Sequence, residues 1–240
     1  MTLARRATAE GVGTALLLVA IVGSGIMAER LSGGNIAIAL LANAIATGGA
    51  LVALILAFGP ISGGHFNPVV TLVDAWRGGT SWISVTAYIV AQFLGAVCGT
   101  ALADGMFSEP LLVASHHVRS GTPMLVGEFI ATFGLLATIC GCVRSKPTMT
   151  PFAVSAYIVG AYWFTPSTSF ANPAVTLARA YTDTFAGIRP VDAPLFIVVQ
   201  LLGALAAIAL FGYLSPASKA TADAVDVAHP EILRARNALG

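Results

Sequence analysis

Charged residues are scarce in this chain of 240 residues. Asp, Glu, Lys and Arg together make up 10% of it, whereas 57% is hydrophobic and the mean hydropathy is +0.85. An ordinary soluble domain carries about 25% charged residues. So little charge cannot cover a water-facing surface, and most of the exterior must therefore face lipid. The formal net charge is +1 and no basic stripe is present, so the sequence does not predict nucleic-acid binding.

Cysteine is almost absent as well. Cys98, Cys140 and Cys142 all lie in apolar segments, which leaves no extracellular disulfide framework to infer. A metal or metalloid site at Cys140 and Cys142 is unfavourable, because residues two apart on a helix point about 200° away from each other. We interpret the cysteines as core-filling residues and predict no metal and no cofactor. Because the chain also lacks a catalytic triad pattern or paired mid-membrane acids, it does not predict an enzyme.

Long stretches contain no charged residue at all. They are Leu31–Val73, Gly78–Ala103, Phe129–Val143, Pro147–Ala178 and Ala193–Ser218. A membrane-spanning helix needs about 20 mostly apolar residues. We therefore predict six spanning helices, near 9–28, 36–58, 82–103, 124–143, 149–166 and 192–214. The first follows two arginines as a signal peptide would, but Glu10 at its start and the apolar span directly after it favour a retained helix.

Two apolar segments are left over, and both begin with Asn-Pro, at Asn67 and at Asn172. The spans around them carry matching polar residues: Glu10 and Gln92 in the first half, Glu128 and Gln200 in the second. Because each half holds three spans, the second copy enters the membrane from the opposite face. Such an inverted repeat tends to place a solute path near the membrane midplane.

Basic residues fall mainly in the connectors, and unevenly. With six spans both termini share one side, which holds Arg5, Arg6, Arg77, Arg144, Lys146, Lys219, Arg234 and Arg236. The other side holds Arg30, Arg119, Arg179 and Arg189. The positive-inside rule therefore predicts cytoplasmic termini. We interpret 1–214 as one channel domain, with repeat one at about 5–104 and repeat two at about 122–214, followed by a cytoplasmic tail at 215–240.

Asn-Pro before an apolar run predicts the start of a helix, because Asn is a favoured N-cap and Pro a favoured first helical residue. The segment from Asn67 to Arg77 allows roughly 16 Å of helix at 1.5 Å per residue, about half of the hydrocarbon core. We call the two Asn-Pro segments, which begin at Asn67 and Asn172, the first and the second box. The runs 61–66 and 166–171 before them are expected to be non-helical. At membrane depth, non-helical backbone is tolerated only inside protein or along a wet cavity.

Two such half-helices would meet N-terminus to N-terminus, each with about half a positive charge. This centre would repel cations and protons, while the Asn amides could donate to a passing neutral oxygen. A single Asn-Pro is a common turn or cap. Its recurrence in matching repeats, each time between hydrophobic spans, favours a functional pair.

The run Ile61–Thr71 and the second box resemble the aquaporins, the major intrinsic protein family, and the resemblance covers about 5–214. It implies an all-α membrane protein with six transmembrane helices plus two re-entrant half-helices, in a homotetramer within the lipid bilayer. The pore motif would comprise Asn67, Pro68, Val69, Asn172, Pro173 and Ala174, with Val69 where Ala is usual. Lumen carbonyls would come from Gly63, Gly64, His65, Thr168, Ser169 and Phe170. Glu10 and Glu128 would brace the re-entrant loops.

Aquaporins usually carry an Arg directly after the second box, at the narrowest point of the pore, and here that residue is Val175. Family spacing places the other filter positions at Thr47, Gly160 and Ser169. These four positions would line the narrowest part of the pore, the selectivity filter. Because none of them carries a guanidinium or an aromatic ring, we expect a wide filter, unless helix shifts or another residue fill the space that these groups would occupy. Arg179 is expected at the vestibule mouth or in a structural pair.

A box that continues with Val175 resembles the aquaglyceroporins of bacterial arsenic-resistance operons. The resemblance implies a passive inner-membrane channel for small neutral solutes: water, glycerol-like polyols, and arsenous acid or methylated arsenicals. A water-selective aquaporin is the alternative. A coupled secondary transporter also has inverted repeats and broken helices, but coupling needs an intramembrane residue that changes its charge. Glu10 and Glu128 are the only candidates, and both lie near span ends.

The histidines are expected to be structural. His65 would face the cytoplasmic vestibule, where a pH gate is conceivable, but we expect it to brace its loop and line the lumen. His116 and His117 lie in the loop 105–122 and are expected to be solvated loop residues.

Overall fold

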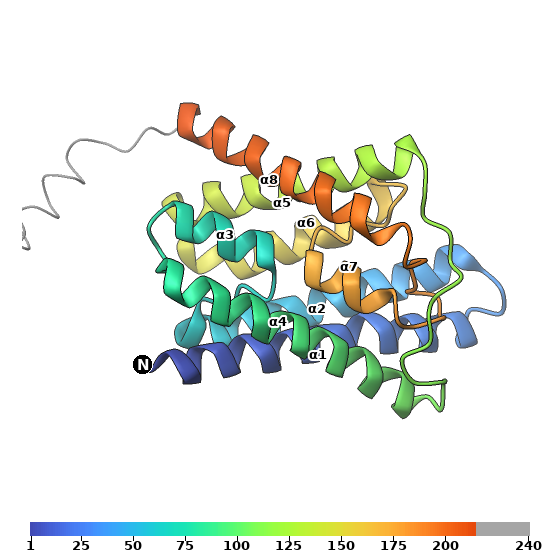
Figure 1. Ribbon diagram of the computed structural model, residues 1–240. Helices are drawn as coiled ribbons and strands as arrows, with labels where there is room; N and C mark the ends of the chain where they lie inside the picture. The colour runs from blue at the N-terminus through green and yellow to red at the C-terminus, as the bar shows by residue number, and fades with distance from the viewer. Residues whose placement is uncertain (215–240) are drawn as a thin grey trace, which may run out of the picture.

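The computed structural model describes residues 1–214, and the regular secondary structure of this part is helical throughout (Figure 1). The helices are α1 Leu3–Leu31, α2 Ile36–Ser62, α3 Pro68–Trp76, α4 Trp82–Met106, α5 Thr122–Ser145, the 3-10 turn η1 Pro147–Met149, α6 Thr150–Phe164, α7 Pro173–Arg179 and α8 Ala193–Leu214. The tail predicted at 215–240 lies outside the described residues.

Helix length separates the elements that can cross a membrane from those that cannot. Five helices, α1, α2, α4, α5 and α8, are long and apolar enough to cross. The sixth, α6, has 15 residues, roughly 22 Å at 1.5 Å per residue, and η1 directly before it lengthens the element. With nine and seven residues, α3 and α7 reach only about 13 and 10 Å. They are half-helices.

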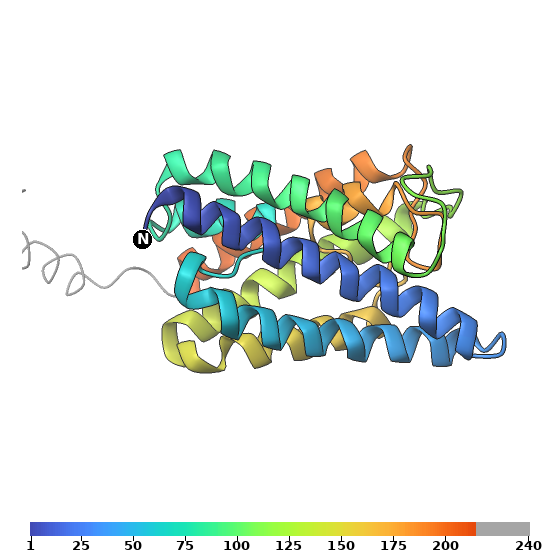
Figure 2. The same ribbon diagram turned by 90° about the horizontal axis from the view of Figure 1, so that it is seen from below.

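The two halves of the chain are packed in the same way. In the first half α1 packs on α2 and α4, and in the second α5 packs on α6 and α8. Figure 2 shows α1 lying between α2 and α4. The half-helices α3 and α7 each contact both α4 and α8. They enter from opposite ends of the bundle, while the N-terminus and the end of α8 lie at one end (Figure 1). This is the predicted inverted repeat.

Close packing of α1 on α4 depends on glycine. A Cβ built at Gly95 would collide with the carbonyl oxygen of Gly11, and one at Gly99 with that of Ala15. Lipid tails are as apolar as a leucine side chain, so helices in a membrane associate through close van der Waals packing of small residues. These glycines let the two backbones approach each other and so fix the position of α1.

The end of α2 differs from the prediction. The sequence indicated a span near 36–58 and non-helical backbone over 61–66, whereas α2 continues through Pro60 to Ser62. The helix ends where Gly63 takes the left-handed conformation (φ 99°), which is a common C-terminal cap. The glycine, and not the proline, is the stop signal, and the irregular segment before the first box is correspondingly shorter.

Candidate functional site

Both half-helices begin at an Asn-Pro pair, as the capping chemistry predicts. Asn67 and Asn172 have extended backbone, and a proline follows each in the first helical turn. The Asn67 side-chain oxygen accepts a hydrogen bond from the N–H of Val69 (3.1 Å). The equivalent oxygen of Asn172 accepts from the N–H groups of Ala174 (3.0 Å) and Val175 (3.3 Å). The two half-helices are thus capped by the same chemistry.

The two caps also hold each other. Asn67 Nδ2 donates to the carbonyl of Ala171, and Asn172 Nδ2 donates to the carbonyl of Phe66, both at 2.8 Å. Each acceptor is the residue directly before the other asparagine, so the N-terminal ends of α3 and α7 meet inside the bundle. Each amide nitrogen retains a second hydrogen. At this junction the partial positive charges of two helix N-termini lie side by side.

The backbone that leads into each cap is left-handed at residues other than glycine. Phe66 and Ala171 occupy equivalent positions, with φ of 49° and 47°. Thr168 and Ser169 have φ of 62° and 52°. Each such residue costs roughly 1–3 kcal/mol and persists only when its surroundings hold it. In this conformation the carbonyl groups do not align along a helix axis, which leaves them able to form a row of acceptors along a pore.

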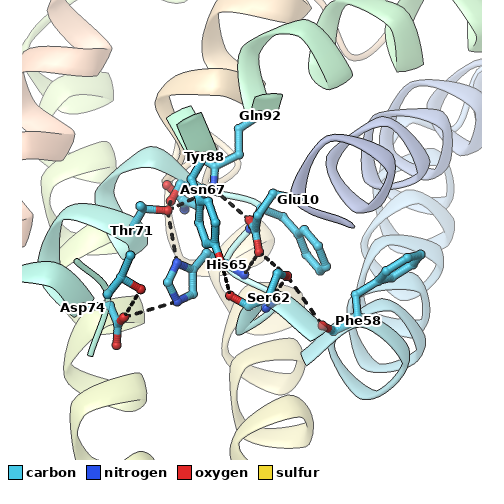
Figure 3. A network of polar contacts seen from close by, with 12 residues as sticks. Glu10, Phe58, Ser62, His65, Asn67, Thr71, Asp74, Tyr88 and Gln92 are labelled. Carbon is cyan, nitrogen blue, oxygen red and sulfur yellow. Dashed lines mark hydrogen bonds and ion pairs between the residues drawn. The ribbon is translucent and has the colours of Figure 1, made fainter. Parts of the chain in front are cut away.

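Glu10 on α1 holds the first irregular segment (Figure 3). Its Oε1 accepts hydrogen bonds from Ser62 Oγ (2.6 Å) and from the N–H of His65 (3.0 Å). Its Oε2 accepts from the N–H of Phe66 (2.7 Å) and from Gln92 Nε2 (2.8 Å). The side chain is fully buried, and a buried carboxylate needs such partners to offset its desolvation.

Glu128 on α5 holds the second segment in the same way. It accepts hydrogen bonds from the N–H groups of Phe170 (2.8 Å) and Ala171 (2.9 Å) and from Gln200 Nε2 (2.7 Å). Gln200 Nε2 also lies 2.9 Å from Thr176 Oγ1 on α7. The carboxylate thus connects a spanning helix to the backbone before one half-helix, and through Gln200 to the half-helix itself.

His65 is tied to α3 and its neighbours. Its Nδ1 lies 3.1 Å from Thr71 Oγ1, and its Nε2 lies 3.6 Å from Asp74 Oδ2 (Figure 3). Gln92 Nε2 donates to the same Thr71 hydroxyl (2.9 Å), and the Thr80 hydroxyl donates to Asp74 (2.6 Å). The ring is therefore held as part of the wall.

A cavity of about 660 Å³ runs past both boxes. Arg6 and Arg77 border it near the chain termini, Asn67 and Asn172 border its middle, and Arg179 borders its far end, called the outer end below. Of the residues whose carbonyls are expected along the lumen, five border this cavity: Gly63, Gly64, His65, Ser169 and Phe170. Thr168 instead borders a second cavity of about 380 Å³, which lies beyond Arg179.

Three of the four expected filter residues, Thr47, Ser169 and Val175, border the large cavity, but Gly160 does not. The residues of α6 that border it are four apart: Thr150, Val154, Ile158 and Tyr162. Gly160 lies two residues from Tyr162 and therefore about 200° around the helix from it. Tyr162 borders the cavity, and its hydroxyl lies 3.3 Å from Thr47 Oγ1. Sequence spacing from a motif predicts how far along a helix a residue lies, but not which side of the helix faces the cavity.

Arg179 lies at the boundary of the two cavities. Among residues 1–214 it is the one that borders both. Its side chain is buried, its Nε donates to the carbonyl of Ala186, and its guanidinium carbon lies 3.4 Å from the centre of the Phe170 ring. An arginine and a tyrosine outside the four expected filter positions thus border the outer part of the path.

The loop histidines lie near the outer end. His116 is exposed and donates its backbone N–H to Asp183, and its Nδ1 lies 2.8 Å from the same carboxylate. These hydrogen bonds hold the pKa of Asp183 below its ordinary value. His117 borders the smaller cavity. In residues 1–214 no cluster of three or more His, Cys, Asp or Glu is placed to bind a metal.

Sequence reasoning did not single out Ser62, Tyr162 or Arg119. Tyr162 belongs to the four-residue period of the cavity-facing side of α6, but that side is known only from the structure. Ser62 reaches Glu10 only because α2 continues past Pro60. Arg119, in the loop after α4, gave no local signal, since its contacts are to loops far away in the sequence.

Six crossing elements, two capped half-helices that meet inside the bundle, and a cavity that passes both caps define a membrane channel with an inverted repeat. The sequence profile described as "Major intrinsic protein" matches residues 1–169. The chain therefore belongs to the major intrinsic protein family, whose members are multi-pass membrane channels and not enzymes.

The chain is similar to proteins from distant organisms. Aquaglyceroporin AqpS of Rhizobium meliloti (strain 1021) is 52% identical over 212 residues, covering 88% of this chain and 91% of the relative. Aquaporin NIP2-2 of Zea mays is 29% identical over 231 residues, covering 91% of this chain and 76% of the relative. The X-ray structure of the aquaglyceroporin from Plasmodium falciparum matches with a TM-score of 0.68 at 20% identity, covering 88% and 96% of the two chains. At that identity the structural likeness shows the fold alone.

Proposed function

We propose that this protein is a passive channel for small uncharged solutes: water, glycerol-like polyols, and arsenous acid or its methylated derivatives. The observation that carries the proposal is the reciprocal bond pair between the boxes. Asn67 and Asn172 each use one amide hydrogen to hold the other repeat, and both border the same cavity. The second hydrogen of each amide can donate to the oxygen of a solute.

The chemistry of the path favours neutral, hydroxylated solutes. The two helix N-termini present partial positive charge to the middle of the path, which opposes cations. Carbonyl groups of Gly63, Gly64 and His65 on one side, and of Ser169 and Phe170 on the other, are proposed as acceptors. A hydroxylated molecule can then exchange water for amide donors and carbonyl acceptors in turn.

The proposed solute range rests on Val175 and on similarity. Val175 stands where the family usually has Arg, so Thr47, Ser169 and Val175 offer a level of the path without a fixed charge. The relative AqpS is named an aquaglyceroporin, which supports solutes larger than water. Arsenous acid is a neutral trihydroxy molecule similar to glycerol in size and hydrogen bonding, and it would suit the same path.

We also propose the setting of the channel. The excess of Arg and Lys on the side of the termini supports cytoplasmic termini in a bacterial inner membrane. A homotetramer with one path per subunit is proposed from the family resemblance. Many large apolar side chains are exposed on the isolated chain, among them Ile45, Leu94, Leu205 and Trp163. Lipid or neighbouring subunits are proposed to cover them.

Reconstitution into liposomes tests this function. Stopped-flow light scattering on proteoliposomes should show water and glycerol permeability well above that of empty liposomes, and arsenite uptake should rise as well. A water-selective pore is the second candidate, because Tyr162 and Arg179 border the outer part of the path. Water flux without glycerol or arsenite flux would favour it. Dependence of solute uptake on an imposed proton or sodium gradient would instead indicate a coupled transporter.

A further inference from the structure

Two arginine side chains lie against one aromatic ring at the outer end of the path. The guanidinium carbon of Arg179 lies 3.4 Å from the centre of the Phe170 ring, and that of Arg119 lies 5.0 Å from it. Both distances are within the range of cation–π attraction. The ring is itself held by an edge-to-face contact with Phe196 at 5.5 Å. The structure thus concentrates two positive charges at the boundary between the two cavities.

The hydrogen bonds of both arginines go to neutral groups. Arg119 Nε donates to the carbonyl of Gly187 (2.7 Å), and its Nη1 donates to the Ser167 carbonyl (3.2 Å) and the Thr168 hydroxyl (3.4 Å). Arg179 Nε donates to the carbonyl of Ala186. Within residues 1–214 the terminal nitrogens of Arg179 make no hydrogen bond to the protein, so they can donate to a solute.

Neither charge is neutralised by an ion pair. Within residues 1–214 no carboxylate lies within 4.0 Å of either guanidinium, whereas Arg30 and Arg189 pair with Glu109 and Asp192. The buried carboxylate of Glu128 does not pair with either arginine. Its oxygens accept hydrogen bonds from two backbone N–H groups and a glutamine instead. The carbonyl dipoles hold the arginines in place without cancelling their charge.

A buried polar side chain without a hydrogen-bond partner lies beside the same end of the cavity. Ser169 is 3% exposed and borders the cavity, and its Oγ makes no hydrogen bond within residues 1–214. The Thr47 and Tyr162 hydroxyls, 3.3 Å apart, border the same cavity.

We propose that Arg179, held by Phe170 and reinforced by Arg119, is the filter arginine of this channel, one helical turn beyond the position where the family usually has it. It excludes cations, including hydronium, at the outer end, and its terminal nitrogens bind the oxygens of a neutral polyol. The inference rests on the proposed channel function and adds the residue that determines its charge selectivity. Val175 leaves room for the solute, while Arg179 retains the charge barrier.

The test compares Arg179→Met, which keeps bulk but removes the charge, with Arg179→Lys, which keeps the charge. Arg30→Met is the matched control, because Arg30 is an ion-paired arginine on the same side of the bundle. Proteoliposomes are assayed for water flux by light scattering, for glycerol uptake, and for proton leak by an enclosed pH dye under a potassium diffusion potential. The native protein should leak protons no faster than empty liposomes.

Arg179→Met should raise the proton leak at least ten-fold while water flux stays within about two-fold, and Arg179→Lys and Arg30→Met should not raise it. If Arg179→Met does not fold, Arg119→Met, in a loop, is expected to raise the leak several-fold. A proton-tight Arg179→Met with normal water flux would overturn the inference and leave the channel function intact. So would a native protein that passes water but leaks protons. A native protein that passes no solute at all would instead overturn the proposed function.

Discussion

Asn67 and Asn172 are tied to each other's repeat by two hydrogen bonds of equal length. Each Nδ2 donates to the carbonyl of the residue just before the other asparagine, at 2.8 Å in both directions. Neither half-helix can therefore move along the bundle without breaking the contact that positions the other. The pair fixes both amides in the path at the same level, which a single capped half-helix could not do.

Replacing Asn67 or Asn172 by Ala should have the same effect at both positions. Each variant loses a helix cap, at about 1 kcal/mol, and leaves a buried carbonyl of the other repeat without its donor, at roughly 1–3 kcal/mol. We expect a clear loss of thermal stability in detergent and a several-fold lower water and glycerol flux. Asn35→Ala is the control, since Asn35 only caps α2. Equal effects of all three variants would contradict the role of the reciprocal bonds.

Glu10→Gln should be strongly destabilising although it is nearly isosteric. The carboxylate accepts four hydrogen bonds, two of them from backbone N–H groups, and an amide would turn a donor toward one of these donors. With roughly 1.5–3 kcal/mol for each hydrogen bond to a charged group, we expect a loss of about 3 kcal/mol or more. Thermal unfolding in detergent measures it.

The comparison for Glu10→Gln is Glu109→Gln, at a partly exposed carboxylate that pairs with Arg30. An ion pair of this kind contributes about 0–1 kcal/mol, so this variant should remain close to the native stability. Glu128→Gln should resemble Glu10→Gln, because Glu128 accepts the equivalents of three of these four bonds in the second repeat. If Glu10→Gln unfolds no earlier than Glu109→Gln, the carboxylate does not hold the loop.

Gly99→Val should disrupt the packing of α1 on α4. A Cβ at Gly99 would meet the backbone of Ala15, which cannot give way as a flexible side chain would. We expect little folded protein in detergent by size-exclusion chromatography. Gly49→Val is the matched change at a helical glycine where an added Cβ meets nothing within 4 Å, and it should be tolerated. Normal folding of Gly99→Val would show that α1 and α4 can separate at small cost.

The capping chemistry made the half-helices predictable, because it is local. Asn and Pro at Asn67 and Asn172 act on the residues that follow them, so α3 and α7 begin where the sequence indicated. The repeat of Glu, Asn-Pro and Gln then implied the inverted arrangement. These features depend on neighbouring residues and on the pattern of the spans, and both can be read from one chain.

The lining of the outer end was less predictable, because it depends on helix rotation and on distant contacts. Family spacing pointed to Gly160, whereas the rotation of α6 turns Tyr162 toward Thr47. Arg179 takes its place from the Phe170 ring and from the Ala186 carbonyl in the loop before α8. Neither contact leaves a trace in the local sequence.

Replacing Val175 by Arg should narrow the range of solutes while sparing water. The change adds bulk, a fixed positive charge and directed donors at a residue that borders the cavity. Uptake of glycerol and of arsenite into proteoliposomes should fall by several-fold, with water flux changed less. Val175→Leu is the control, because it adds bulk without charge and separates the two effects.

Because Val175 lies close to Arg179 on α7, the Val175 variants separate the effect of added charge from the effect of pore width. Arg179 is four residues further along the same helix face, so a new arginine would add a second guanidinium to the path, and the two positive charges would repel each other. If Val175→Leu alone lowers glycerol uptake as much as Val175→Arg, width decides selectivity at this level. If the arginine variant passes glycerol and arsenite as well as the native protein, Val175 does not lie at a constriction. If the native protein passes only water, the neutral level at Val175 does not widen the pore, and Tyr162 and Arg179 set its width.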